Sequence, residues 1–100
     1  MYAIHVTDEF QEWLDRLRDE RARVRISARL RIAATGNLGD WRPVGGCVSE
    51  MRIDVGAGYR LYFMRQGRFV IVMLGGGDKS SQRRDIEDAR RLADEWEFAQ

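Results

Sequence analysis

The chain has 100 residues, of which 44% are hydrophobic and 33% are charged, and its formal net charge is +1. These totals exclude a disordered chain and fit a single domain, residues 1–100, with one modest core. No apolar stretch reaches membrane-spanning length, and the first ten residues lack the basic and apolar regions of a signal peptide, so we expect a cytoplasmic protein without an anchor.

Some chemistry is disfavoured by the residues that are scarce. Cys47 is the single cysteine and His5 the single histidine, so we expect no internal disulfide and no metal site. His5 lies on the first predicted strand, a structural position, so we also expect no catalysis by a Ser-His-Asp set. Sixteen of the seventeen basic residues are arginine, and arginine grips phosphate bidentately. A GC-rich genome would give the same arginine excess, so composition alone leaves both explanations open.

The first half of the chain predicts a strand and two helices. Residues 2–6 favour β structure and end at Thr7, which can cap a helix over residues 8–19. Residues 21–26 alternate basic and apolar like an exposed strand, but the longer window favours a second helix that ends at Gly36. Its apolar face comprises Ala22, Ile26, Leu30 and Ala33, and its basic face comprises Arg18, Arg21, Arg25 and Arg29. The basic face is either solvated or binds RNA phosphates or an acidic partner.

The middle of the chain predicts a loop followed by a β-hairpin. Residues 36–46 contain four glycines and the single proline, which predicts a loop around Trp41 and Arg42. Residues 47–55 and 58–67 alternate in polarity about a three-residue turn, Gly56-Ala57-Gly58. That turn predicts the pairs Ile53–Leu61, Met51–Phe63, Arg52–Tyr62 and Asp54–Arg60. The charged face of this hairpin is either solvated or a concave basic surface with an aromatic ring for base stacking.

The last part of the chain predicts a central strand, a glycine turn and a helix. Residues 69–74 are apolar throughout, which is typical of a strand covered on both faces. Ser80 or Ser81 can cap a helix whose inward residues are Ile86, Ala89, Leu92, Ala93 and Trp96. The element order is β-α-α-β-β-β-α, an α+β domain with helices packed on a curved, mainly antiparallel sheet.

The glycines of LGGGDKSSQRRDI do not match a nucleotide-binding loop. Asp78 stands where a Walker loop needs glycine before the lysine, and Ser80 stands where a dinucleotide fingerprint needs its third glycine. The stretch is therefore either a plain strand-to-helix turn or an anion site made of free backbone N–H groups, a helix N-terminus and Lys79.

The run EMRIDVGAGYRLYF, followed by an apolar strand and GGDKSSQRRDI, resembles the RelE/ParE toxin superfamily, and most closely its HigB-like addiction module killer branch. The resemblance implies a RelE-like fold and a toxin of a type II toxin–antitoxin pair, neutralised by an antitoxin that often has a helix-turn-helix. RelE-like members act in the ribosomal A site and cut mRNA without metal or cofactor, by attack of the ribose 2′-OH on the adjacent phosphate.

The resemblance also implies roles for individual residues. Arg60 and Lys79 act on the scissile phosphate, and the RNA is held by Arg52, Tyr62, Arg42 and Arg83. The tyrosine of RelE's last helix has no counterpart among Arg83, Arg84 and Asp85. Two alternatives therefore stay open: a ParE-like protein that blocks DNA gyrase, and an inactive homologue that only binds its antitoxin.

Overall fold

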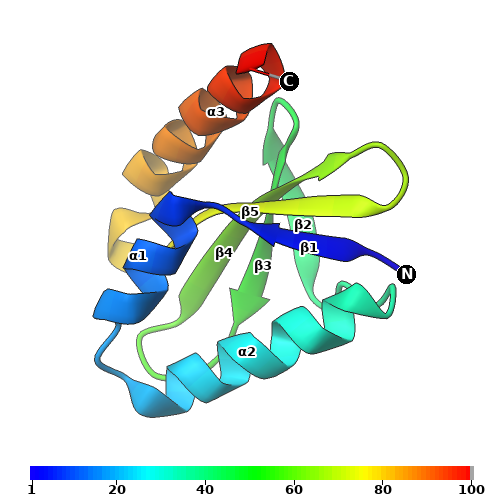
Figure 1. Cartoon of the computed structure of the whole chain (residues 1–100). Helices are drawn as coiled ribbons and strands as arrows, with labels where there is room; N and C mark the ends of the chain where they lie inside the picture. The colour runs from blue at the N-terminus through cyan, green and yellow to red at the C-terminus, as the bar shows by residue number, and fades with distance from the viewer. Residues whose placement is uncertain (100) are drawn as a thin grey trace.

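The computed structural model describes residues 1–99, with side chains as far as residue 96, and has an α+β architecture (Figure 1). The chain forms five strands, which make one mixed sheet, and three α-helices. They are β1 (Ala3–Val6), α1 (Asp8–Arg16), α2 (Glu20–Ala34), β2 (Trp41–Gly45), β3 (Val48–Ile53), β4 (Tyr59–Gln66), β5 (Val70–Asp78), the short 3-10 helix η1 (Lys79–Ser81) and α3 (Gln82–Ala99). No helix in this part of the chain is long and apolar enough to cross a membrane.

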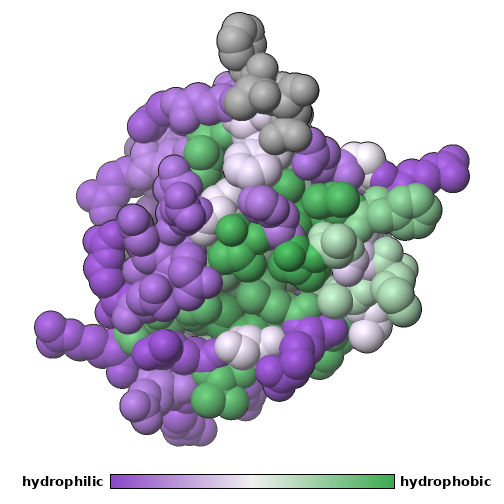
Figure 2. Space-filling model, viewed as in Figure 1, coloured by the Kyte–Doolittle hydropathy of each residue, from purple (hydrophilic) through white to green (hydrophobic). Residues whose placement is uncertain are grey.

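The sheet has the order β1-β5-β4-β3-β2, with β1 parallel to β5 and the other neighbours antiparallel. Helices α1 and α2 pack on one face and α3 packs on the other, which gives two apolar clusters (Figure 1). Ile71 and Met73 belong to the first cluster, and Val72 and Leu74 to the second. The prediction of a central strand covered on both faces is therefore confirmed. Hydrophilic residues coat the outer sides of the helices (Figure 2).

The predicted cap of α1 is confirmed. The Thr7 hydroxyl oxygen accepts a hydrogen bond from the Phe10 N–H at 3.2 Å and donates to the Met73 carbonyl at 2.7 Å. Helix α1 ends at Arg16, earlier than predicted, because Asp19 has an extended backbone and caps the next helix. The Asp19 carboxylate accepts a hydrogen bond from the Ala22 N–H at 3.1 Å, so the chain must leave the helical conformation before it.

The longer helical window is also confirmed, since α2 buries Ala22, Ile26 and Ala33. One member of its basic face has a structural role. The Arg29 guanidinium donates hydrogen bonds to the backbone carbonyls of Arg52, Leu38 and Asp40 at 2.7, 3.0 and 2.9 Å. Arg29 thereby fastens the α2–β2 loop to β3. The other members stay exposed: Arg18, Arg21 and Arg25.

The predicted loop over residues 36–46 contains a strand, β2, so the observed order is β-α-α-β-β-β-β-α. The four glycines and Pro43 favour a loop in this segment, and proline also lacks the N–H that an inner strand needs. Here β2 is the edge strand, where that N–H is dispensable, and the pairing with β3 shifts between Pro43 and Gly45. Gly45 and Gly46 take φ values of 124° and 59°, which turn the chain sharply into β3.

The predicted hairpin register is wrong by two residues. Met51 pairs with Leu61, not Phe63, and Ile53 pairs with Tyr59. The turn spans residues 54–58, because β3 ends at Ile53. A shift of two residues preserves which side chains share a face, so the assignment of faces still holds. The predicted Asp54–Arg60 pair is wrong, because the cross-strand neighbour of Arg60 is Arg52.

The glycines predicted to form a turn belong to β5 instead, and the turn is made by η1. Gly75, Gly76 and Gly77 lie opposite Tyr62, Leu61 and Arg60 of β4. A Cβ atom on Gly76 would collide with the Trp13 ring of α1, and one on Gly77 would collide with the Asp85 carboxylate of α3. Glycine is needed at these two positions because a helix approaches the strand closely from each face.

Candidate anion-binding site

A charged side chain, Glu50, is completely buried on the sheet face that α3 covers. Its carboxylate accepts a 2.7 Å hydrogen bond from the Arg42 Nε and one of 3.2 Å from the Gln82 side-chain amide. The Arg60 Nε lies 3.6 Å from the Oε2 atom of Glu50, and Arg60 is only 6% exposed. An isolated buried carboxylate costs several kcal/mol. We call these four residues, Arg42, Glu50, Arg60 and Gln82, the Glu50 cluster.

The sheet register assembles the cluster and adds two neighbours. Arg42 pairs with Glu50 across β2 and β3, and Glu50 pairs with Tyr62 across β3 and β4. Arg52 lies two residues beyond Glu50 and directly opposite Arg60. Alternate residues of a strand share a face, so all five side chains emerge on the α3 side of the sheet.

Four buried donor atoms on the α3 side make no hydrogen bond within the described part of the protein: Arg52 Nε, Arg60 Nε, the Tyr62 hydroxyl and Trp96 Nε1. The first three belong to the sheet. The 3.6 Å separation between Arg60 and Glu50 is an ion pair but too long for a hydrogen bond. Each unsatisfied buried group costs about 1–3 kcal/mol. These donors lie on one face next to two opposed arginines, and an anion is the kind of group that would supply the acceptors they lack.

The electrostatics of the face agree with an anion as the missing group. Arg42 and Arg60 both pair with the carboxylate of Glu50, whereas Arg52, on the same sheet face, makes no ion pair with it. Burial raises the pKa of Tyr62, and the negative charges of Glu50 and Asp85 raise it further. The Tyr62 hydroxyl therefore keeps its proton at neutral pH and can only act there as a neutral donor or acceptor.

The residues singled out from the sequence fall into two groups. Arg42, Arg52, Arg60 and Tyr62 come together on the α3 face, and the half-exposed Arg42 side chain extends this group to the surface. Lys79 and Arg83 are exposed, in η1 and in the first turn of α3. Lys79 lies against the β3–β4 turn, where a Cβ atom on Gly58 would come within 2.8 Å of its Cε.

Two expectations about this region need revision. Tyr62 is completely buried, so its ring has no free face on which a base could stack in this conformation. The glycine N–H groups expected to bind an anion belong to a strand, and the turn that follows is capped by Asp78, whose carboxylate accepts a 2.8 Å hydrogen bond from the Ser80 N–H. Hydrogen bonds from the Ser80 hydroxyl and backbone lower the pKa of Asp78.

Glu50 and Gln82 were not singled out from the sequence. Glu50 carried a detectable signal, because it alternates with Arg52 on the strand face that also presents arginine and tyrosine. Gln82 carried none, because its contact with Glu50 depends on where α3 begins. Among the side chains that the structure describes, no group of three or more histidine, cysteine, aspartate or glutamate residues could hold a metal ion.

Comparison with known proteins places the chain in a family. No protein-family model matches it. A Haemophilus influenzae protein, described as an uncharacterized protein, is 42% identical over 92 residues, which cover 92% of this chain and 93% of that protein. The chain belongs to the same family as this Haemophilus influenzae protein. The match extends over nearly the whole domain in both proteins, so the relationship concerns the complete fold and not a single motif.

Proposed function

We propose that the chain is the toxin of a type II toxin–antitoxin module and that it inhibits translation as a metal-independent, ribosome-dependent mRNA endonuclease. The observation that carries the proposal is the set of unsatisfied donors on Arg52, Arg60 and Tyr62. The resemblance of GYRLYF and GGDKSSQ to RelE-like and HigB-like toxins supports an RNA phosphate as the missing acceptor. The expected partners are the ribosome, mRNA and a cognate antitoxin with a helix-turn-helix.

A phosphate fits the arrangement of the two opposed arginines. Arg52 and Arg60 are cross-strand neighbours, and the Cα atoms of such pairs are about 4.5–5.5 Å apart. Like charges directly opposite each other on neighbouring strands are destabilising, and an anion beside them offsets the repulsion. A phosphate offers several acceptor oxygens, so a single group can satisfy both Nε atoms and the Tyr62 hydroxyl once this face opens, because all three atoms are buried in the present conformation.

The proposed reaction is attack of a ribose 2′-OH on the adjacent phosphorus. The new O2′–P bond forms as the P–O5′ bond breaks, which leaves a 2′,3′-cyclic phosphate and a 5′-hydroxyl. The 2′-OH loses its proton, and the departing 5′ oxygen gains one. Negative charge accumulates on the non-bridging oxygens in the transition state, where Arg60 and Lys79 stabilise it. Arg52, Arg42 and Arg83 hold the RNA backbone, and Tyr62 donates its hydroxyl hydrogen to the phosphate.

Glu50 serves in this proposal as a positioning residue. Its carboxylate contacts Arg42, Arg60 and Gln82, so it holds two arginines from different strands in a single arrangement. Substitution of Glu50 by glutamine keeps the side-chain size but removes the charge that orients the guanidinium groups. We expect E50Q to lower the cleavage rate more than it weakens RNA binding, because both arginines remain present.

The test is induced expression followed by mapping of new mRNA 5′ ends. The wild-type chain is expected to stop growth and to generate new ends, whereas R60A and R52Q generate none. R21A is the matched control, because it removes one exposed arginine from α2 and should cut as the wild type does. Circular dichroism of the purified variants establishes that each is folded.

Two outcomes would overturn the proposal. Growth arrest by the wild type and by R52Q alike, without new mRNA ends, would contradict a nuclease. Inhibition of DNA gyrase in a supercoiling assay by the same purified protein would then assign it a ParE-like activity. Absence of growth arrest by the wild type would favour an inactive homologue that binds only its antitoxin.

A further inference from the structure

The strand β5 extends well beyond the strand that covers its outer edge. β1 pairs with β5 only from Val70 to Met73, while β4 stays paired with β5 as far as Asp78. The stretch from Leu74 to Asp78 therefore has a neighbouring strand on one side only. In such a stretch, alternate residues direct their backbone N–H and C=O groups away from the sheet, where a further strand can bind them.

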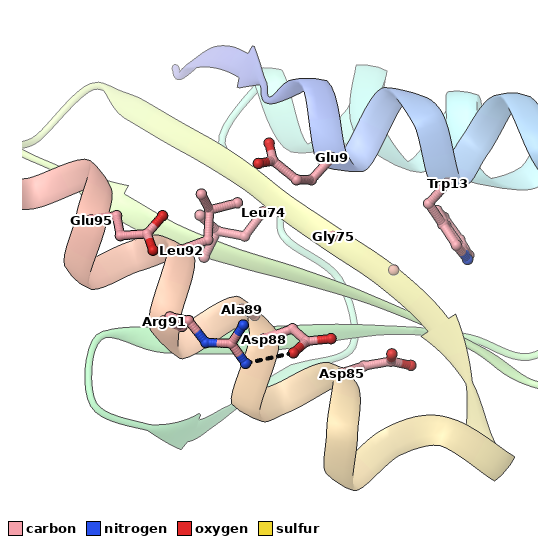
Figure 3. A pocket seen from close by; sticks show the side chains of 11 residues that line it. Glu9, Trp13, Leu74, Gly75, Asp85, Asp88, Ala89, Arg91, Leu92 and Glu95 are labelled. Carbon is pink, nitrogen blue, oxygen red and sulfur yellow. Dashed lines mark hydrogen bonds and ion pairs between the residues drawn. The ribbon is translucent and has the colours of Figure 1, made fainter. Parts of the chain in front are cut away.

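The end of β1 is built into the sequence at Thr7. The Thr7 N–H and hydroxyl both donate to the Met73 carbonyl, at 3.2 and 2.7 Å. The chain then enters α1 at Asp8 and rises onto one face of the sheet instead of continuing beside β5. The free edge is thus a fixed feature of the fold, flanked by α1 on one side and α3 on the other (Figure 3).

A groove runs along this free edge. Its volume is about 350 Å³, at the small end for sites that enclose a small molecule. It is lined by Glu9, Trp13, Leu74, Gly75, Gly76, Asp85, Asp88, Ala89, Arg91, Leu92 and Glu95. Figure 3 shows Glu9 and Trp13 coming from α1, the acidic side chains of α3 opposite them, and Gly75 on the strand that passes between. A Cβ atom on Gly75 would meet nothing within 4 Å, so the space beside this residue is open.

The charge of the groove selects its occupant. Four carboxylates line it, on Glu9, Asp85, Asp88 and Glu95, against a single cation, Arg91. Arg91 donates to Asp88 at 2.9 Å and so neutralises one of the four. The groove therefore combines an apolar floor, a net negative rim and an unpaired strand edge.

We propose that this groove binds an extended, arginine- or lysine-rich segment of a partner protein, which adds a strand to the free edge of β5. A strand rises about 3.3 Å per residue, so the five residues from Leu74 to Asp78 accommodate a segment of about four or five residues. Successive side chains of the segment alternate between the α1 and α3 sides. Basic side chains on the α3 side would reach Asp85, Asp88 or Glu95, and those on the α1 side would reach Glu9.

This inference does not depend on the proposed nuclease activity. It uses the outer edge of β5 and its backbone groups, whereas the proposed phosphate site uses side chains of β2, β3 and β4 together with Lys79 and Arg83. A failure of either proposal leaves the other standing, because RNA cleavage and peptide binding are measured separately.

The test is fluorescence anisotropy with a labelled seven-residue peptide that alternates arginine and valine. Two further peptides separate backbone pairing from simple charge attraction: one with glutamate in place of arginine, and one with the same sequence but N-methylated at alternate backbone amides. The protein is expected to bind the arginine peptide at least tenfold more tightly than either. Amide hydrogen exchange at Gly75, Gly76 and Gly77 is expected to slow when it binds.

A variant of Gly75 tests the location without threatening the fold. G75V places a side chain in open space, and valine favours strands more than glycine does, so G75V should be at least as stable as the wild type. We expect it to bind the arginine peptide at least tenfold more weakly. Equal binding of the arginine and N-methylated peptides, or undiminished binding by folded G75V, would overturn the proposal.

Discussion

The two faces of strand β4 are built on different principles. The face toward α1 and α2 carries Tyr59, Leu61 and Phe63 in an apolar cluster, and the Tyr59 hydroxyl donates to Asp19 at 3.3 Å. The face toward α3 carries Arg60 and Tyr62, and both have buried donors without hydrogen-bond partners. The first face contributes stability. The second sacrifices stability, which is expected where a protein keeps donors ready for a ligand.

A large loss of stability should come from separating the buried charges. R60A removes one partner of the fully buried Glu50, and breaking a buried pair in this way typically costs about 3–5 kcal/mol. Glu50 retains Arg42 and Gln82, so we expect a value near the lower end. Urea unfolding measures it.

A double variant separates the charge from the packing. R60M combined with E50M removes both charges and keeps side chains of similar length, so it should recover most of the lost stability while still failing to cut RNA. If the double variant is as unstable as R60A, the loss of stability in R60A comes from losing the Arg60–Glu50 ion pair. It would then not come from leaving the Glu50 carboxylate without Arg60.

The apolar face should respond by stability alone. L61A creates a cavity at a completely buried position on the α1 and α2 side, and such substitutions cost about 2–5 kcal/mol. Below its unfolding transition, L61A should bind RNA as the wild type does, because Leu61 points away from the arginines. Loss of RNA binding by folded L61A would contradict the claim that the α1 and α2 face contributes only stability and the α3 face binds RNA.

The two tyrosines of β4 offer a smaller and more discriminating pair. Y62F removes a buried hydroxyl that has no partner and should raise the free energy of unfolding by about 1 kcal/mol while weakening RNA binding. Y59F removes the hydrogen bond to Asp19 and should lower stability by about 1 kcal/mol without affecting RNA. Urea titrations and RNA-binding curves of both variants measure these changes. If Y62F and Y59F change the free energy of unfolding equally and with the same sign, the predicted difference between the two tyrosines is wrong.

The smallest expected effects on stability concern the carboxylates of Asp85 and Asp78. The two are told apart by how stability changes with pH. Burial raises the pKa of Asp85 in the folded protein, partly opposed by the hydrogen bond from the Ser81 hydroxyl. The folded protein therefore loses stability as the pH rises from the unfolded value of about 3.9 through the higher folded value. D85N is expected to be more stable than the wild type at pH 7, with a difference that fades as the pH falls to about 4.

Asp78 supplies the control of opposite sign. Its folded pKa is lowered by Ser80, so its ionised form contributes stability above the unfolded value, and that contribution is lost as the pH falls through the folded value. D78N should therefore be less stable than the wild type at pH 7 and equal to it in strong acid. Unfolding curves between pH 2 and pH 7, which span the pKa of about 3.9 of a free aspartate, measure both variants. If D85N and D78N change stability in the same direction with pH, burial does not govern the pKa of Asp85.

The sequence predicts those parts of the fold that depend on neighbours along the chain. The Thr7 cap, the buried positions of α2 and the two-sided burial of residues 70–74 all follow from local periodicity and capping. The β3–β4 register did not follow, because alternation repeats every two residues and a shift of two leaves every face unchanged. Turn length decides the register, and here Asp19 of the α1–α2 connection lies against Gly56, where a Cβ atom would be 2.6 Å from its carboxylate.

For the candidate site, the sequence predicts only which types of residue share a face of the sheet. Alternation placed arginines and Tyr62 on one face, but the burial of Tyr62 depends on where α3 packs, which no local pattern specifies. The same holds for Glu50, whose role becomes visible only when β2, β4 and α3 surround it. The glycines were misjudged as a turn because their reason, close approach of Trp13 and Asp85, is entirely tertiary.

The most direct test of the central claim is an NMR titration of the arginine Nε–H signals with a short RNA that carries 2′-O-methyl groups and cannot be cut. We predict large shifts for Arg52 and Arg60, whose Nε atoms lack partners, and no shift for Arg29, whose guanidinium is already bound to backbone carbonyls. Unchanged Arg52 and Arg60 signals, with shifts confined to the exposed arginines of α2, would contradict a phosphate site on the α3 face.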